Sequence, residues 1–295
     1  MTALAKALRE NAAAVNDALD RLLPRAQGAE GRVAEAMRYA TLAGGKRLRP
    51  FLVRASAELF DVPERAALRA AAAVEMIHSY SLVHDDLPAM DDDELRRGQP
   101  TCHVKFDEAT AILAGDALLT LAFEVLSAPE THADAAVRCD LVHGLALAAG
   151  SGGMVGGQMI DLVVEGRALD IDDVTHLQAL KTGALIAFSC EAGAILGEAG
   201  SQAREVLAGY GRDLGLAFQV ADDLLDIEGS AAETGKAVGK DAAAGKATFV
   251  DLLGVERARG FAGELVERAC AGLEPFAGKA ELLRQVARFV IDRRH

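Results

Sequence analysis

Apolar side chains recur along most of this 295-residue chain at the three- to four-residue spacing of amphipathic helices. No stretch alternates apolar and polar residues for long, so the pattern predicts helices and no β-sheet. Several of these helices are apolar on more than one face, as the central helices of a large bundle are. The predicted helices span about 63–85, 107–126, 131–149, 172–197, 201–227, 248–259, 261–273 and 279–293.

Helix stops and starts divide the chain without marking a domain boundary. Gly44 and Gly45 are typical of a helix end, Pro50 can open the next helix, and Asp61 followed by Pro63 gives a cap and an early proline. The connections are short, and no linker or long internal repeat interrupts them. We therefore predict a single all-α domain over residues 1–295.

Composition supports this class and excludes several others. Hydrophobic residues make up 51% of the chain, aromatics only 4%, and tryptophan is absent, which favours helices packed on helices. A formal net charge of −13 argues against a nucleic-acid-binding protein. Residues 141–160 carry no charge, but six glycines interrupt them, so we expect no membrane insertion.

The cysteines and the N-terminus indicate a cytoplasmic protein. The N-terminal stretch is charged and amphipathic and lacks the apolar core of a signal peptide. The four cysteines show neither a C-x-x-C pair nor zinc-ligand spacing, so we expect reduced, mostly buried thiols. They are Cys102, Cys139, Cys190 and Cys270.

Six carboxylates crowd into residues 85–94, directly after an apolar helix. The first of them should lie at the edge of a core, where unpaired charge is costly, and a bound cation would remove that cost. A second group, Asp222, Asp223 and Asp226, lies within another apolar helix, with Asp222 and Asp226 on one face. Oxygen-only ligands indicate magnesium or manganese.

Short basic clusters suggest what the metal would accompany. Lys46, Arg47 and Arg49 follow two glycines, and Arg96 and Arg97 follow the first acidic run. Arginine suits bidentate phosphate contacts and lysine a point-charge contact, so a diphosphate is the natural ligand. The glycine-rich 150–157 lacks the ending of a nucleotide-binding P-loop and predicts close helix packing or a bend.

Taken together, these motifs resemble the trans-isoprenyl diphosphate synthases, most closely the bacterial farnesyl diphosphate synthases. The resemblance covers nearly the whole chain. The motifs that carry it are Gly44–Pro50, Ile77–Gly98, Gly156–Leu162, Lys181–Gly183, Phe218–Asp226 and Gly239–Thr248. It implies the isoprenoid synthase helical bundle around a central cavity, a homodimer, and three magnesium ions held with bound diphosphate.

The resemblance also implies roles for individual residues. The metal ligands would be Asp85, Asp86, Asp91, Asp222 and Asp226. The allylic diphosphate would be held by Arg96, Lys181 and Lys236, and isopentenyl diphosphate by Gly45, Lys46, Arg47, His78 and Arg97. Thr182 and Gln219 would line the path of the developing allylic cation.

The implied reaction joins dimethylallyl or geranyl diphosphate to isopentenyl diphosphate, giving mainly farnesyl diphosphate and pyrophosphate. Tyr80 lies five residues before Asp85, about 7.5 Å along the helix, where an aromatic limits chain length in the related farnesyl synthases, while Ser81 is too small to block. Geranylgeranyl diphosphate synthase is the alternative product class. Three further functions would also use parts of this pattern: a terpene cyclase, a metal-dependent phosphohydrolase using His84–Asp85, and a non-catalytic synthase subunit.

Overall fold

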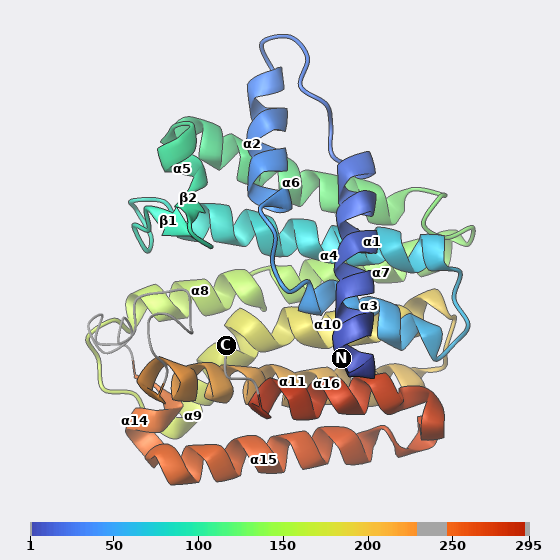
Figure 1. The fold of residues 1–295 in the computed structure, drawn as a ribbon, viewed down its shortest axis with the longest axis vertical. Helices are drawn as coiled ribbons and strands as arrows, with labels where there is room; N and C mark the ends of the chain where they lie inside the picture. The colour runs from blue at the N-terminus through green and yellow to red at the C-terminus, as the bar shows by residue number, and fades with distance from the viewer. Residues whose placement is uncertain (1, 229–246, 293–295) are drawn as a thin grey trace. The chain divides into compact units, whose positions relative to one another are not determined.

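The computed structural model describes residues 2–228 and 247–292 (Figure 1). It is helical almost throughout, which confirms the predicted all-α class. The chain forms two compact units, one made of Met1–Arg54 and Val62–Val142 and the other of Ala55–Asp61 and His143–His295. That these units make up a single domain stays a prediction.

The first unit is built around a long alanine-rich helix. Its elements are α1 (Ala3–Leu22), α2 (Gly31–Leu42), the start of α3 (Leu48–Glu58), α4 (Glu64–Asp85), β1 (Leu95–Arg96), β2 (Gln99–Pro100), α5 (Cys102–Lys105), α6 (Glu108–Ser127) and the start of α7 (Ala135–Ala149). Helices α4 and α6 run side by side (Figure 1). Residues 70–73 of α4 are alanines at most 1% exposed, and their small size lets neighbouring helices approach closely.

The second unit is a bundle centred on α11. Its elements are the end of α3, the end of α7, α8 (Met154–Val163), α9 (Ile171–Gln178), the π-helical turn η1 (Ala179–Gly183), α10 (Ala184–Leu196), α11 (Ser201–Glu228), α14 (Phe249–Leu253), α15 (Val255–Gly272), the 3-10 helix η2 (Glu274–Ala280) and α16 (Glu281–Asp292). Helix α11 packs against α10 and α15. The buried Tyr210 hydroxyl donates to the Leu283 carbonyl at 2.7 Å and ties α11 to α16.

Three sequence predictions were wrong in detail. The expectation of no sheet missed the hairpin β1–β2, whose two-residue turn has positive φ at both Arg97 and Gly98, as a type I′ turn requires. The helix over 172–197 contains a π-helical turn. The break near residue 260 lies instead at Gly254, which has a φ of 77°.

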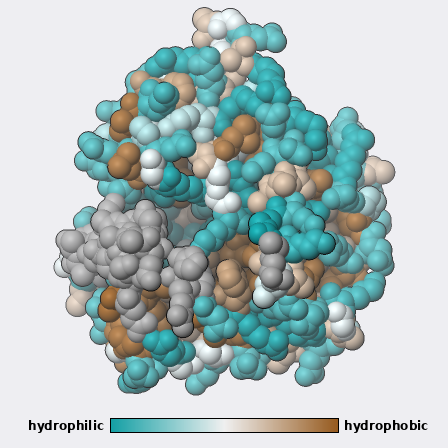
Figure 2. Space-filling model, viewed as in Figure 1, coloured by the Kyte–Doolittle hydropathy of each residue, from teal (hydrophilic) through white to brown (hydrophobic). Residues whose placement is uncertain are grey.

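The surface and the cysteines agree with the composition. The face shown in Figure 2 is mostly hydrophilic with scattered apolar residues. All four cysteines are unpaired, and only Cys139 is exposed. By length and composition alone, two helical stretches among the described residues could cross a membrane, Glu108–Ser127 and Ile171–Leu196, a test that core helices of soluble proteins also pass.

Candidate active site

The first aspartate motif lies where α4 ends. Helix α4 runs to Asp85, and the N–H of Asp86 still donates to the Leu82 carbonyl at 3.1 Å. The chain then folds back, because the N–H of Asp91 donates to the Asp85 carbonyl at 2.8 Å. Asp85 is half-buried at the end of this buried helix, where the sequence placed the first carboxylates, and the turn brings the exposed Asp91 beside it.

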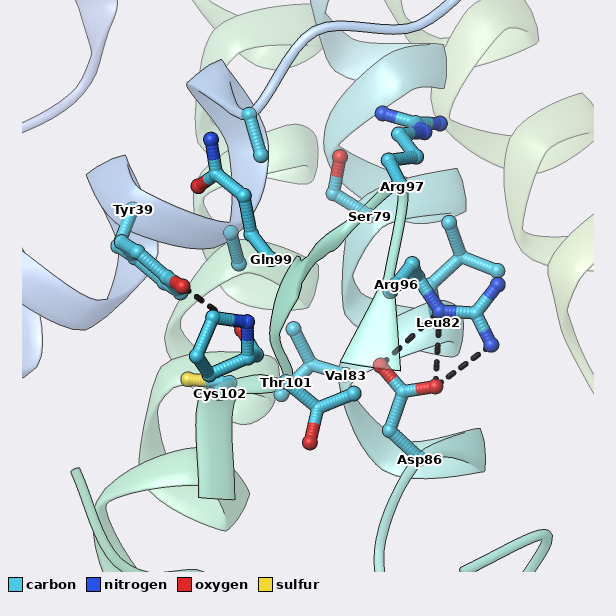
Figure 3. Close-up of a pocket in the computed structure, with 13 residues that line it drawn as sticks. Tyr39, Ser79, Leu82, Val83, Asp86, Arg96, Arg97, Gln99, Thr101 and Cys102 are labelled. Carbon is cyan, nitrogen blue, oxygen red and sulfur yellow. Dashed lines mark hydrogen bonds and ion pairs between the residues drawn. The ribbon is translucent and has the colours of Figure 1, made fainter. Parts of the chain in front are cut away.

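The side chain of Asp86 is buried and binds Arg96. The Arg96 Nε lies 2.8 Å and 3.0 Å from the two carboxylate oxygens, and Nη2 lies 2.5 Å from Oδ1 (Figure 3). Burial raises the pKa of the Asp86 carboxyl, and the contact with Arg96 opposes that rise. Asp86 as a metal ligand stays a prediction, since both of its oxygens accept from the arginine that was predicted to hold substrate.

A pocket opens beside this ion pair, wholly within the first unit. Its walls include Asp86, Arg96, Tyr39 and Cys102 (Figure 3). The Tyr39 hydroxyl donates to the Pro100 carbonyl at 2.7 Å and fixes the hairpin against α2. Burial raises the pKa of the Cys102 thiol to about 12, so this cysteine is no nucleophile at neutral pH.

The glycine turn before α3 meets the second arginine of the hairpin. Gly45 has a φ of 128°, and a Cβ there would lie 2.7 Å from the guanidinium carbon of Arg97. Arg97 in turn donates to the Gly44 carbonyl. The structure therefore brings together Gly45 and Arg97, two residues predicted to bind isopentenyl diphosphate, while Lys46 beside them is exposed.

Arg47 has a different environment from the one predicted. It is 3% exposed, and its guanidinium pairs with Glu75 on α4 at 2.5 Å and also donates to Asn16 Oδ1 and the Thr41 carbonyl. The Asn11 side chain donates to the Arg47 carbonyl at 3.1 Å. Because every one of these contacts faces the interior, the structure points to a structural role for Arg47 rather than a diphosphate contact.

Arg49 belongs to the basic cluster after the two glycines, but the family resemblance gave it no role of its own. It lies in the first turn of α3 and is partly exposed. Burial holds the pKa of His78 well below its ordinary value, and among the nearby charges Arg49 lowers that pKa most, ahead of Arg97. The sequence did hold a signal that could have separated the two arginines. Arg47 and Arg49 lie two residues apart, and side chains at that spacing face different surroundings.

Tyr80 and His84 occupy one face of α4. Tyr80 is 5% exposed, its ring meets the His84 ring edge-on at 5.8 Å, and burial raises its pKa to about 12. His84 Nε2 lies 3.1 Å from the Ile112 carbonyl, and the ring packs on Gly115, where an added Cβ would come within 2.0 Å. His84 is thus a packing residue, which removes the support for the phosphohydrolase alternative. The neighbouring Ser81 hydroxyl donates to the His78 carbonyl.

In the second unit, Lys181 is held by the π-helical turn and by α8. Its Nζ lies 2.6 Å from Asp161 Oδ2, with the two side chains 27% and 14% exposed. A Cβ on Gly157 would lie 2.2 Å from the Lys181 backbone nitrogen, and one on Gly215 would lie 2.8 Å from the Gly183 Cα. The predicted close packing of the glycine-rich segment is confirmed at Gly157.

The adjacent residues form a hydrogen-bonded row from η1 to α14. The Thr182 hydroxyl donates to Gln219 Oε1 at 3.3 Å, and Gln219 Nε2 donates to Asp223 Oδ1 at 3.3 Å. Asp223 Oδ2 accepts from the Phe249 N–H at 2.8 Å. Asp223 was counted in the second acidic group, but neither Asp223 nor Asp161 was given a role of its own, although both stand inside motifs that carry the family resemblance.

The metal-binding aspartates predicted in this unit lie on the same helix. Asp222 is exposed and Asp226 half-buried on α11. Among residues 2–228 and 247–292, no three His, Cys, Asp or Glu side chains gather into one metal-binding group. Magnesium is usually bound through one or two carboxylates together with substrate phosphates, and this pair of one exposed and one half-buried carboxylate fits that chemistry. Lys236 and most of Gly239–Thr248 lie outside the described residues.

Known proteins resemble this chain along almost its whole length. The polyprenyl synthetase family matches residues 30–274. The farnesyl diphosphate synthase of Escherichia coli is 47% identical over 94% of this chain and 95% of that protein. Geranylgeranyl pyrophosphate synthase 4 of Arabidopsis thaliana is 42% identical over 95% of this chain and 76% of that protein.

A solved structure shows the same likeness in three dimensions. A crystal structure described as an FPP/GFPP synthase from Zymomonas mobilis in its apo form superposes with a TM-score of 0.90, at 47% identity and 98% coverage of both chains. Such coverage takes in both aspartate motifs and both units. The chain belongs to the polyprenyl synthetase family.

Proposed function

We propose that this protein is a farnesyl diphosphate synthase, which joins an allylic diphosphate to isopentenyl diphosphate and releases pyrophosphate. The observation that carries the proposal is the backbone turn that returns Asp91 to Asp85 beside the Asp86–Arg96 pair. It presents carboxylates and a guanidinium on one edge of α4, the combination that a diphosphate accompanied by a divalent metal requires. The 47% identity to the Escherichia coli enzyme supports the same reaction.

The reaction begins with cleavage of the allylic carbon–oxygen bond, whose electron pair leaves with the diphosphate. Arg96 and Lys181 supply positive charge to the leaving group, and the predicted contribution of Lys236 would add to it. The double bond of isopentenyl diphosphate then supplies the pair for the new carbon–carbon bond. A proton is lost to the released pyrophosphate, so no side-chain base is required.

Magnesium would be held by Asp85, Asp91, Asp222 and Asp226. Asp86 would be a fifth ligand, as the family resemblance implies. When bound, magnesium or manganese neutralises charge on the leaving diphosphate. Isopentenyl diphosphate would be held apart from it by Gly45, Lys46, His78 and Arg97, and we add Arg49 to this set. Arg47 positions these residues from the interior through Glu75.

The product is proposed to be mainly the fifteen-carbon farnesyl diphosphate. Tyr80 is buried on α4, toward the N-terminus from Asp85, where its ring would block further growth of the hydrocarbon chain and so form the floor of the site. Ser81 beside it is too small to block the chain, so the tyrosine ring would set the product length. Geranylgeranyl diphosphate is the alternative product, because one relative at 42% identity is named for that activity.

A homodimer and a cytoplasmic location complete the proposal. The first unit exposes Ile112 at 45% and Leu113 at 53% on α6, apolar side chains that a second copy could cover. Unpaired cysteines agree with a reducing compartment. Light scattering of the wild type and of an Ile112→Arg variant tests the dimer, and an unchanged mass in the variant would remove α6 from the interface.

Incubation with geranyl diphosphate, isopentenyl diphosphate and magnesium tests the reaction. Farnesyl diphosphate should form, and Asp85→Ala should cut turnover by about 100-fold or more without unfolding the protein. Release of inorganic phosphate without a longer chain would indicate a phosphohydrolase, and a cyclic hydrocarbon from one substrate would indicate a cyclase. The absence of product from the protein alone, with product on adding another subunit, would indicate a non-catalytic partner.

A further inference from the structure

Asp223 is the inward member of the second aspartate motif. Its neighbour Asp222 is exposed and Asp226 is half-buried, whereas Asp223 is only 5% exposed. A buried carboxylate is costly unless its oxygens are hydrogen-bonded, so its partners show what it is for. Both oxygens have partners here, and the partners belong to different parts of the second unit.

The Oδ2 atom of Asp223 binds the start of α14. Asp223 Oδ2 accepts the Phe249 N–H at 2.8 Å, one residue after Thr248 caps the helix through Asp251. This N–H lies in the first turn of α14, where backbone donors have no partner within the helix. The contact therefore ties α14 to α11 at a fixed point.

The Oδ1 atom of Asp223 determines which atom donates in each hydrogen bond of the row Thr182–Gln219–Asp223. Gln219 Nε2 donates to Asp223 Oδ1 at 3.3 Å, and a carboxylate oxygen that carries no proton can pair only with this NH₂ end of the amide. The Oε1 end of Gln219 is then turned to Thr182, and the Thr182 hydroxyl must donate to it. With its proton committed, the hydroxyl can offer only lone pairs to any other partner.

We propose that Asp223 is a positioning residue that makes Thr182 present oxygen lone pairs, and not a proton, to the reacting allylic carbon. This inference rests on the proposed function. When the allylic carbon–oxygen bond breaks, positive charge develops on carbon. A lone pair stabilises that charge, while a hydroxyl proton aimed at it repels it. Asp223 acts on the reaction only through Gln219 and touches no reacting atom.

The Asp223→Asn variant changes the direction of the hydrogen bonds while keeping the size of the side chain. The amide oxygen of the new residue can still accept the Phe249 N–H, but its NH₂ group then faces Gln219, whose amide must turn over. Gln219 would donate to Thr182, and the hydroxyl proton would be released toward the substrate. We expect kcat to fall about 10-fold or more, while KM for both substrates stays within about 3-fold and the melting temperature changes little.

The double variant Asp223→Asn/Gln219→Glu tests the direction itself. The glutamate introduced at position 219 only accepts, so it takes the NH₂ of the asparagine introduced at position 223 and again forces the Thr182 hydroxyl to donate. The double variant carries the same net charge as the wild type. It should recover at least about 3-fold of the turnover lost in Asp223→Asn. The matched control is Asp213→Asn, which changes another aspartate of α11, one that pairs with Arg268 on α15. This control should leave kcat unchanged.

The outcomes are distinguishable. A wild type that makes no prenyl product contradicts the proposed function. An active wild type with unchanged kcat in Asp223→Asn, or a double variant no faster than the single one, overturns the inference. If Asp223→Asn does not fold, Gln219→Leu breaks the row while Asp223 keeps Phe249, and an unchanged kcat in that variant overturns the inference equally.

Discussion

Arg47 Nη1 lies 2.5 Å from Glu75 Oε1, and both side chains are almost fully buried, at 1% and 3% exposure. Removing one member of such a pair leaves an uncompensated charge in the interior. Glu75→Gln should lower the free energy of unfolding by about 3–5 kcal/mol, measured by denaturant titration. Glu64→Gln, in the exposed pair with Arg54, should cost at most about 1 kcal/mol. Equal costs for the two variants would contradict the structural role of Arg47.

Arg49→Ala tests the isopentenyl diphosphate subsite. If Arg49 and His78 hold that diphosphate, KM for isopentenyl diphosphate should rise about 10-fold or more, with KM for the allylic substrate nearly unchanged. Steady-state kinetics with each substrate varied in turn give both constants. Arg65→Ala, at an exposed position on α4, is the control. Equal increases in both constants would place Arg49 outside this subsite.

Gly157→Ala should disturb Lys181. An added Cβ would lie 2.2 Å from the Lys181 nitrogen and 2.5 Å from its Cα, which are backbone atoms that cannot swing aside. We expect a loss of about 1–3 kcal/mol of stability and a higher KM for the allylic diphosphate. Gly152→Ala, where no atom lies within 4 Å, should behave like the wild type. An unaffected Gly157→Ala enzyme would mean that α8 does not set the position of Lys181.

Tyr80→Ala should lengthen the product. The ring is buried against His84, and its removal frees space on the face of α4 that leads away from Asp85. Chromatography of the products should show chains of twenty carbons or more, whereas Tyr80→Phe, which keeps the ring, should still give fifteen. If Tyr80→Ala makes only the fifteen-carbon chain, the floor lies elsewhere.

His78 should make the protein less stable in mild acid. Its pKa is lowered from 6.5 in the folded state by burial and by the adjacent arginines. Below pH 6.5 the unfolded chain binds a proton that the folded protein does not, so stability falls as pH falls toward the folded pKa. His78→Gln should flatten this slope by up to about 1.4 kcal/mol per pH unit between about pH 5 and 6.5. Denaturant titrations across that range measure it, with the exposed His143→Gln as control. A slope as steep in His78→Gln as in the wild type would contradict the assignment.

The long helices were predictable because their signals are local. Helix α11 carries its apolar period in its own sequence, and Asp222 and Asp226 share a face because they lie four residues apart on that helix. The inward turn of Arg47 was not predictable, because its partner Glu75 lies 28 residues away and Arg49 has the same side chain. The contact of Asp223 with α14 was hidden likewise, since Phe249 lies 26 residues on.

The hairpin and the π-helical turn escaped prediction for a different reason. Each strand of the hairpin has only two residues, too few to show any alternation. The π-helical turn departs from the α-helical period by a single residue, which leaves the apolar pattern on either side readable as one helix.

Because of the π-helical turn, the positions of Lys181 and Thr182 depend on the number of residues in this stretch as well as on their identity. A π-helical turn takes up one residue more than an α-helical turn, so deleting one position between Leu177 and Leu185 would convert it into a regular α-helix and leave the segments on either side facing as they do now. Val174 and Leu177 would stay in the core, whereas the residues within the turn would change the face on which they lie. Insertions and deletions here therefore act on Lys181 and Thr182 as directly as substitutions do, and alignments of relatives should keep this length without gaps.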